Sequence, residues 1–185
     1  MISVAKLRFF RSKLNQTLHR WGQEWELRER FPTAKIEEGV QIKNHDLLAL
    51  GENVMIQKGT VLHCGGMAWS NGKGGIRIGN STGISPYCVL YGAGGISIGE
   101  RCALGPGVIM LSSIEEYRTI KSQREHLLKE IRIGNDVFIG AGSFVNFGVT
   151  IGGGVLVYAG SIVTKDLPPN TVCRGIPAEP IGERR

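Results

Sequence analysis

The chain has 185 residues, of which 27 are glycine, and its 22 Lys and Arg outweigh 16 Asp and Glu to give a formal net charge of +6. No apolar run approaches the roughly 18 residues of a transmembrane helix, and the basic residues form no nucleic-acid-binding motif with interleaved aromatics. Four cysteines without CxxC spacing predict reduced thiols, with no metal site and no disulfide framework. We therefore expect one main domain that stays in the cytoplasm.

Residues 1–31 form the first predicted segment, an amphipathic helix that Pro32 ends. Apolar residues recur there at spacings of three and four, along one helix face: Val4, Leu7, Phe10, Leu14, Leu18, Trp21 and Trp25. Basic residues precede the first acid, Glu24. Two interpretations stay open. Residues 1–25 lie on an anionic membrane near a lipid-linked saccharide, or the helix packs across a neighbouring subunit or the end of the next domain.

Residues 32–185 form the second predicted domain, in which an aliphatic residue recurs at every sixth position of five triplets. The triplets are Leu50, Ile56, Leu62; Ile78, Ile84, Leu90; Ile98, Leu104, Met110; Ile133, Ile139, Val145; and Ile151, Val157, Val163. An amphipathic helix needs a period of about 3.6 and a half-buried strand a period of about 2, so neither fits. A six-residue period predicts an all-β solenoid in which each unit is one short strand and one turn.

The other positions of the hexad support this prediction. The fifth position is small or β-branched, as a tight corner requires, from Val54 and Thr60 to Val155 and Ser161. The second position is often glycine, as in Gly51, which suits either an unusual backbone conformation or a close approach of two backbones.

Insertions interrupt the repeat at three places. Ten extra residues follow Leu62, two follow Leu90 and seventeen follow Met110. Each insertion comes after the third hexad of a triplet. If three hexads make one triangular coil, all insertions leave along one edge, where solenoids commonly build a binding face.

The stretches IRIGNSTGISPYCVLYGAGGISIGERCALGPGVIM and IRIGNDVFIGAGSFVNFGVTIGGGVLVYAGSIVTKDLPPNTVCRGIPAEPI resemble the left-handed β-helix (hexapeptide-repeat) acyltransferases, which include galactoside, maltose, serine and capsular-sugar O-acetyltransferases. The resemblance covers residues 36–181. It implies a left-handed parallel β-helix of hexapeptide repeats, a homotrimer with sites between protomers, and transfer of an acetyl group from acetyl-CoA to a saccharide hydroxyl in polysaccharide biosynthesis. A γ-class carbonic anhydrase shares this fold but needs a histidine trio that the four scattered histidines do not provide.

The resemblance implies a general base on the excursion after LGPGV, where the family has a histidine and this chain has Glu115. Glu115, His126 further along the same excursion and His63 at the insertion edge are competing candidates. His19 and His45 are expected to lie away from that edge. The fourth hypothesis is a non-catalytic β-helix protein that binds CoA or a partner.

The resemblance also implies residues that hold the co-substrates. Ala141, Ala159, Thr164 and Lys165 match the positions that contact CoA, with Lys165 neutralising a phosphate unless it is only a solvated surface lysine. Ser85 stands where relatives often have an Asn that orients the acceptor.

Overall fold

The structure is a computed structural model that describes residues 14, 22–116 and 125–185. The chain divides into two compact units, Met1–Pro32 and Thr33–Arg185.

In the first unit, Leu14 and residues 22–30 are helical. Leu14 and Trp25 are 59% and 67% exposed. The rest of the predicted apolar stripe lies outside the described residues: Val4, Leu7, Phe10, Leu18 and Trp21. Within the described ranges, no helix is both long enough and apolar enough to cross a bilayer. Membrane contact through residues 1–25 stays a prediction.

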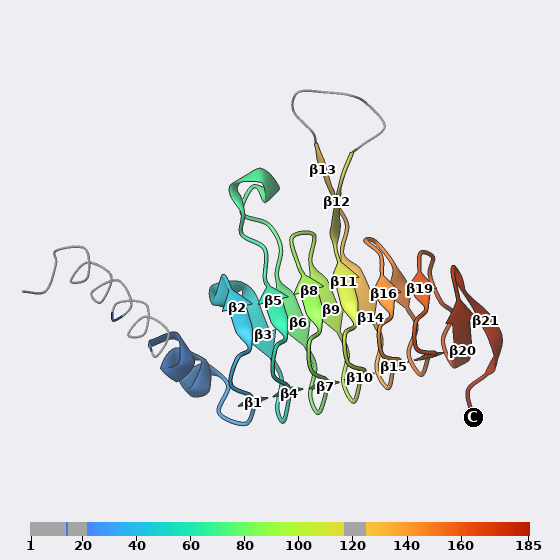
Figure 1. The fold of residues 1–185 in the computed structure, drawn as a ribbon, viewed down its shortest axis with the longest axis horizontal. Helices are drawn as coiled ribbons and strands as arrows, with labels where there is room; N and C mark the ends of the chain where they lie inside the picture. Colours follow the sequence, from blue (N-terminus) through green and yellow to red (C-terminus); the bar gives the residue numbers. More distant parts are fainter. Residues whose placement is uncertain (1–13, 15–21, 117–124) are drawn as a thin grey trace, which may run out of the picture. The chain divides into compact units, whose positions relative to one another are not determined.

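The second unit is a stack of coils that pass through three sheets in a fixed order (Figure 1). Sheet A contains β1 (Lys35–Ile36), β4 (Met55–Ile56), β7 (Gly83–Ile84), β10 (Ala103–Leu104), β15 (Phe138–Ile139), β18 (Leu156–Val157), β20 (Thr171–Gly175) and β21 (Ala178–Glu183). Sheet B contains β2 (Gln41–Lys43), β5 (Val61–His63), β8 (Val89–Tyr91), β11 (Ile109–Leu111), β16 (Phe144–Val145) and β19 (Ile162–Val163). Sheet C contains β3 (Leu48–Leu50), β6 (Ile76–Ile78), β9 (Ile96–Ile98), β14 (Ile131–Ile133) and β17 (Thr150–Ile151). Within these three sheets, neighbouring strands are parallel except β20 and β21.

Five full coils follow from this order, and we number them along the chain. Coil 1 is residues 48–63, coil 2 is 76–91, coil 3 is 96–111, coil 4 is 131–145 and coil 5 is 150–163. The chain turns from sheet C to sheet A at the C–A edge, from A to B at the A–B edge, and from B to C at the B–C edge. A partial coil, β1 and β2, precedes coil 1 and was not part of the predicted triplets.

The predicted aliphatic positions form the core. They stack in register from coil to coil, as in the column Leu62, Leu90, Met110, Val145 and Val163. All but the half-buried Leu50 are at most 4% exposed. Burial stabilises the fold by about 1.5–3 kcal/mol for each such side chain. Because each column needs neighbours above and below, a single coil has no core of its own.

The small fifth positions are also buried, and several of them tie one coil to the next. Thr82 Oγ1 donates to the carbonyl of Gly99 at 2.8 Å, and Cys102 Sγ donates to that of Gly134 at 3.1 Å. Burial raises the pKa of the Cys102 thiol, as it does for Cys88. All four cysteines are buried, and none of them forms a disulfide bond.

Glycine at the second position serves close approach. A Cβ added at Gly140 would lie 2.3 Å from the backbone nitrogen of Ala159 in the next coil. The φ angle of Gly140 is not in the positive range that favours glycine. Gly140 is therefore explained by the close approach of two backbones and not by an unusual backbone conformation.

All the insertions leave the stack at the B–C edge, as the repeat predicted (Figure 1). We call residues 64–75 the first excursion, which contains the short helix η2 (Ala68–Ser70), and residues 112–130 the third excursion. The third excursion contains a hairpin of β12 (Ser113–Glu115) and β13 (His126–Leu128). The link between β2 and β3 holds the short helix η1 (His45–Leu47).

Ionic contacts join coils at the C–A edge. The Arg101 guanidinium of coil 3 donates to both carboxylate oxygens of Asp136 in coil 4, at 2.7 and 2.9 Å. Hydrogen bonding to Arg101 lowers the pKa of the Asp136 carboxyl. Arg184, next to the C-terminus, donates to the carbonyl oxygens of Asp136 and Val155. These contacts involve the edge that carries none of the predicted site residues.

Candidate functional site

His63 is the last residue of β5, at the start of the B–C edge. Its neighbours in register are Lys43 and Tyr91, and its ring stacks on that of Tyr91 with centroids 5.3 Å apart. Burial, followed by the positive charge of Lys43, lowers the pKa of His63. The buried Nδ1 atom of His63 has no hydrogen-bond partner among the described residues. His63 is therefore a neutral imidazole at pH 7, the form in which a histidine accepts a proton.

Glu115 and His126, which the sequence presented as competitors, lie opposite each other. They are register partners in the antiparallel hairpin of the third excursion, so their side chains lie on one face with Cβ atoms about 4.5–5.5 Å apart. Both side chains are half-buried. The next register pair along the hairpin, Ile114 and Leu127, lies on the other face, and both of its residues are exposed. The fold brings a carboxylate and an imidazole to one side of one hairpin.

The first and third excursions touch through aromatic rings. The indole of Trp69, in η2, stacks on the imidazole of His126 with ring centroids 4.0 Å apart. The sequence did not single out Trp69, because a tryptophan inside an irregular insertion carries no periodic signal. Tyr91 was also missed, although it follows Leu90 as His63 follows Leu62, and this equivalence was readable from the hexads.

His45 is a correction to the sequence interpretation. It was expected away from the insertion edge, but η1 lies in the link from sheet B to sheet C, on the B–C edge. The error arose because the partial coil before Leu50 was not counted. The Nδ1 atom of His45 lies 3.5 Å from a carboxylate oxygen of Asp46. His19 lies outside the described residues.

The A–B edge holds the remaining acceptor candidate and half of the cofactor candidates. Ser85 follows β7 in coil 2, and its carbonyl accepts a hydrogen bond from Thr60 Oγ1 at 3.2 Å. Ala141 in coil 4 and Ala159 in coil 5 are exposed and lie in adjacent turns, since the Gly160 amide donates to the Ala141 carbonyl at 2.8 Å.

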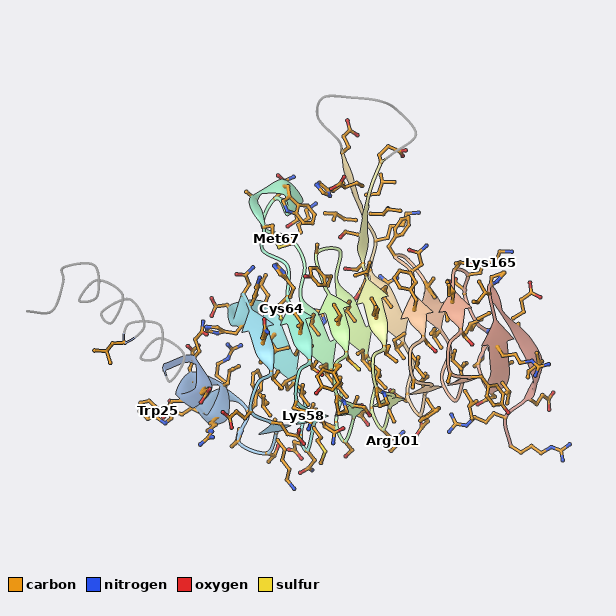
Figure 2. All side chains as sticks on the ribbon, viewed as in Figure 1. Trp25, Lys58, Cys64, Met67, Arg101 and Lys165 are labelled. Carbon is orange, nitrogen blue, oxygen red and sulfur yellow. The ribbon has the colours of Figure 1, made fainter. Side chains whose placement is uncertain are left out.

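Thr164 and Lys165 lie on the other edge. They follow β19, at the end of coil 5 on the B–C edge, and both are exposed. Figure 2 shows Lys165 and Met67 of the first excursion on the same side of the stack, and Lys58 of the A–B edge on the opposite side. Within one chain, sheet B therefore separates the two pairs of cofactor candidates.

The candidates are also ordered along the stack. The cofactor candidates occupy coils 4 and 5, whereas His63 and Ser85 belong to coils 1 and 2, and the hairpin with Glu115 and His126 follows coil 3. This order would place a long ligand that starts at Lys165 with its other end at the excursions. A carboxylate and two imidazoles at that end supply one thing that acyl transfer needs, a candidate general base.

Comparisons with known proteins agree with this fold. Residues 130–165 match the family model described as hexapeptide repeat of succinyl-transferase. The chain is 38% identical over 89 residues to galactoside O-acetyltransferase of Escherichia coli (strain K12), a match covering 48% of this chain and 44% of that protein. The match thus spans less than half the length of this relative.

Two solved structures cover much more of the chain. AntD, an N-acyltransferase from Bacillus cereus in complex with dTDP and 3-hydroxybutyryl-CoA, has a TM-score of 0.75 and 26% identity over 88% of each chain. A hexapeptide-repeat containing acetyltransferase of Vibrio cholerae, complexed with acetyl-CoA, has a TM-score of 0.60 and 27% identity over 89% of this chain and 78% of that one. The predicted resemblance and the predicted left-handed parallel β-helix are both confirmed.

Proposed function

Since this chain shares its repeat and its fold with the left-handed β-helix acyltransferases, we propose that it transfers an acyl group from acyl-CoA to an acceptor. The acyl group is acetyl and the acceptor a saccharide hydroxyl. One observation carries this proposal: the cofactor candidates lie at coils 4 and 5 on the two edges that flank sheet B, and the titratable candidates lie at earlier coils of one of these edges, the B–C edge. The proposed setting is polysaccharide biosynthesis in the cytoplasm.

A complete site requires more than one copy of the chain. Ala141 and Ala159 of the A–B edge meet Thr164 and Lys165 only if the B–C edge of a second copy lies against them. A rotation about an axis parallel to the stack brings these two edges together. Because such a rotation does not shift the copies along the stack, each coil of one copy lies beside the same coil of the next copy. We propose a cyclic homotrimer with sheet B facing the axis.

The outward face of sheet B is suited to this role. One outward column is apolar and stays in register over the five coils: Val61, Val89, Ile109, Phe144 and Ile162. The outward residues of sheet C are more polar and include Arg77 and Arg132. Light scattering should report about three times the chain mass of 20.1 kDa. A stable monomer would remove the shared site.

The hairpin is the proposed source of the base. His126 takes the proton of the acceptor hydroxyl, and Glu115 on the same face orients the imidazole and stabilises its charged form. The acceptor oxygen then attacks the thioester carbon, the carbon–sulfur bond breaks, and CoA leaves with the proton. Trp69, stacked on His126, holds the ring in place. His63 is the competing base, because its lowered pKa keeps it neutral.

One feature favours a second candidate function. Glu115 stands where the resemblance implies a histidine, as expected of a β-helix protein that binds CoA or a partner without turnover.

A single assay separates the two functions. Release of the CoA thiol from acetyl-CoA would be followed over nucleotide sugars, free saccharides and amino sugars, alongside calorimetric titration with CoA. Acceptor-dependent thiol release establishes the transferase. CoA binding without release on any acceptor establishes the non-catalytic CoA-binding protein. Absence of CoA binding rejects both the transferase and the CoA-binding protein, and leaves a protein that binds only a partner.

A further inference from the structure

Tyr87 has a backbone conformation that is rare for its residue type. It lies at the A–B edge of coil 2 with φ +61°, whereas the equivalent residues of the other four full coils are glycines with positive φ: Gly59, Gly107, Gly142 and Gly160. A bulky side chain at positive φ is a genuine outlier. Such strain persists only where the surrounding structure or a function requires it.

Burial does not compensate for this strain. Tyr87 is 62% exposed, and the buried positions of its hexad belong to Ile84 and Cys88. One edge of the ring lies over Gly59, where an added Cβ would be 2.4 Å from Tyr87 Cδ1. The glycine in coil 1 thus leaves room for a ring that lies along the edge and keeps most of its surface in solvent.

The position of Tyr87 relates it to the proposed site. Ser85, the acceptor candidate, precedes it by two residues on the same edge. Ala141 lies two coils further along that edge, which is about 10 Å at the spacing of adjacent strands. A ligand that runs from coil 5 toward coil 3 would therefore end one coil short of Tyr87, with its reactive end facing the tyrosine.

We propose that Tyr87 is a specificity-determining contact that stacks on a flat ring of the acceptor. This inference rests on the proposed function. The shared chemistry is a broad ring face that can stack on an aromatic ring. Either a nucleobase or the C–H face of a pyranose supplies it, and an exposed tyrosine binds both through its π-face and apolar body. In the proposed trimer, the B–C edge of the neighbouring copy closes this subsite at the height of Tyr91.

The test compares Tyr87→Asn with Tyr87→Phe. Asn accepts positive φ, so the first variant should fold at least as stably as the wild type while lacking the ring, and Tyr87→Gly serves as a second ring-free variant. The matched control is Phe138→Ala, which removes another exposed aromatic from sheet A, away from both site edges. Calorimetry would use the CoA-saturated protein with thymidine diphosphate or guanosine diphosphate in one arm and methyl β-galactoside in the other.

In whichever arm the wild type binds, Tyr87→Asn and Tyr87→Gly should weaken binding by on the order of 10-fold, the usual effect of losing one stacking contact. Tyr87→Phe and Phe138→Ala should keep wild-type affinity, and CoA affinity should not change in any variant. Unchanged affinity in the ring-free variants, or no binding of any probe to a wild type that binds CoA, overturns the inference. A lowered oligomer mass without loss of affinity also overturns it. Failure of the wild type to bind CoA counts against the proposed function instead.

Discussion

The A–B and B–C edges belong to the same repeat but differ in almost every local property. Each A–B turn has the same length, and Gly105 and Gly140 in two of these turns pack against the backbone of the next coil. The B–C links differ in length and include two excursions with aromatic and titratable side chains. The stack therefore needs short turns of constant length at only two of its three edges. The third edge is free to vary because insertions there do not disturb the register of the sheets.

The largest expected effect tests the variable edge. Glu115→Gln, His126→Ala and His63→Ala would be made separately, and the hairpin variants should lower turnover by about 100- to 10,000-fold, the usual contribution of a general base. CoA affinity, measured by calorimetry, should stay near the wild-type value. A large loss in His63→Ala alone would transfer the role of base to His63. Full activity in all three variants would mean that the base lies elsewhere.

The A–B edge should tolerate an added side-chain atom far less well than the B–C edge. Gly140→Ala should destabilise the protein by about 3 kcal/mol, because the new Cβ would lie 2.3 Å from a backbone atom that cannot move without separating coils 4 and 5. Chemical denaturation would measure the change. Gly83→Ala is the matched control, since an added Cβ there meets nothing within 4 Å, and it should be neutral or slightly stabilising. Equal effects of the two substitutions would contradict the close-packing argument.

Periodicity predicted the stack because each core position depends only on its own hexad and the two neighbouring coils. The buried columns, the small fifth positions and the single insertion edge all follow from that rule. Sheet C shows where the rule of one core residue per hexad is incomplete. Four more residues there are buried, each two residues before a predicted core position: Leu48, Ile76, Ile96 and Ile131. Three-residue strands in sheet C place both outer residues inward, which a one-residue-per-hexad rule does not include.

The site was less predictable because it depends on contacts between segments that share no repeat. The sequence named Glu115 and His126 but had no means of pairing them, since their register depends on where the hairpin turns. The stack of Trp69 on His126 joins two separate insertions. The resemblance supplied four cofactor positions without showing that sheet B separates them into two pairs.

Lys165 links the B–C edge to cofactor affinity. If it neutralises a CoA phosphate, Lys165→Ala should weaken CoA binding by about 1–2 kcal/mol, as expected for a charge-assisted contact. Because Lys165 is exposed, the loss should shrink as salt is raised from low to high ionic strength. Calorimetry at two salt concentrations would measure both effects. Lys58→Ala, at an exposed position of the A–B edge, is the matched control and should show neither.

The smallest expected effect is the pH dependence of stability that His63 contributes. Burial and then the charge of Lys43 lower the pKa of His63 in the folded protein, below the value of about 6.5 that a histidine has in an unfolded chain. Between these two pKa values the unfolded chain binds a proton that the folded protein does not, so the free energy of unfolding rises with pH in that window. The contribution is complete above about pH 6.5 and decreases as the pH falls toward the lowered pKa.

Removal of the imidazole should flatten this dependence. His63→Gln should lose less stability than the wild type between pH 7.5 and pH 5.5, measured as the difference in melting temperature at the two pH values. Lys43→Met should have a smaller effect in the same direction, because burial, the larger cause, remains. Since the inward-facing neighbour Leu62 is unchanged in both variants, the stack itself should stay intact. Identical pH slopes for the wild type and His63→Gln would show that the folded protein accommodates the charged imidazole, and a neutral base at this position would then lose its physical basis.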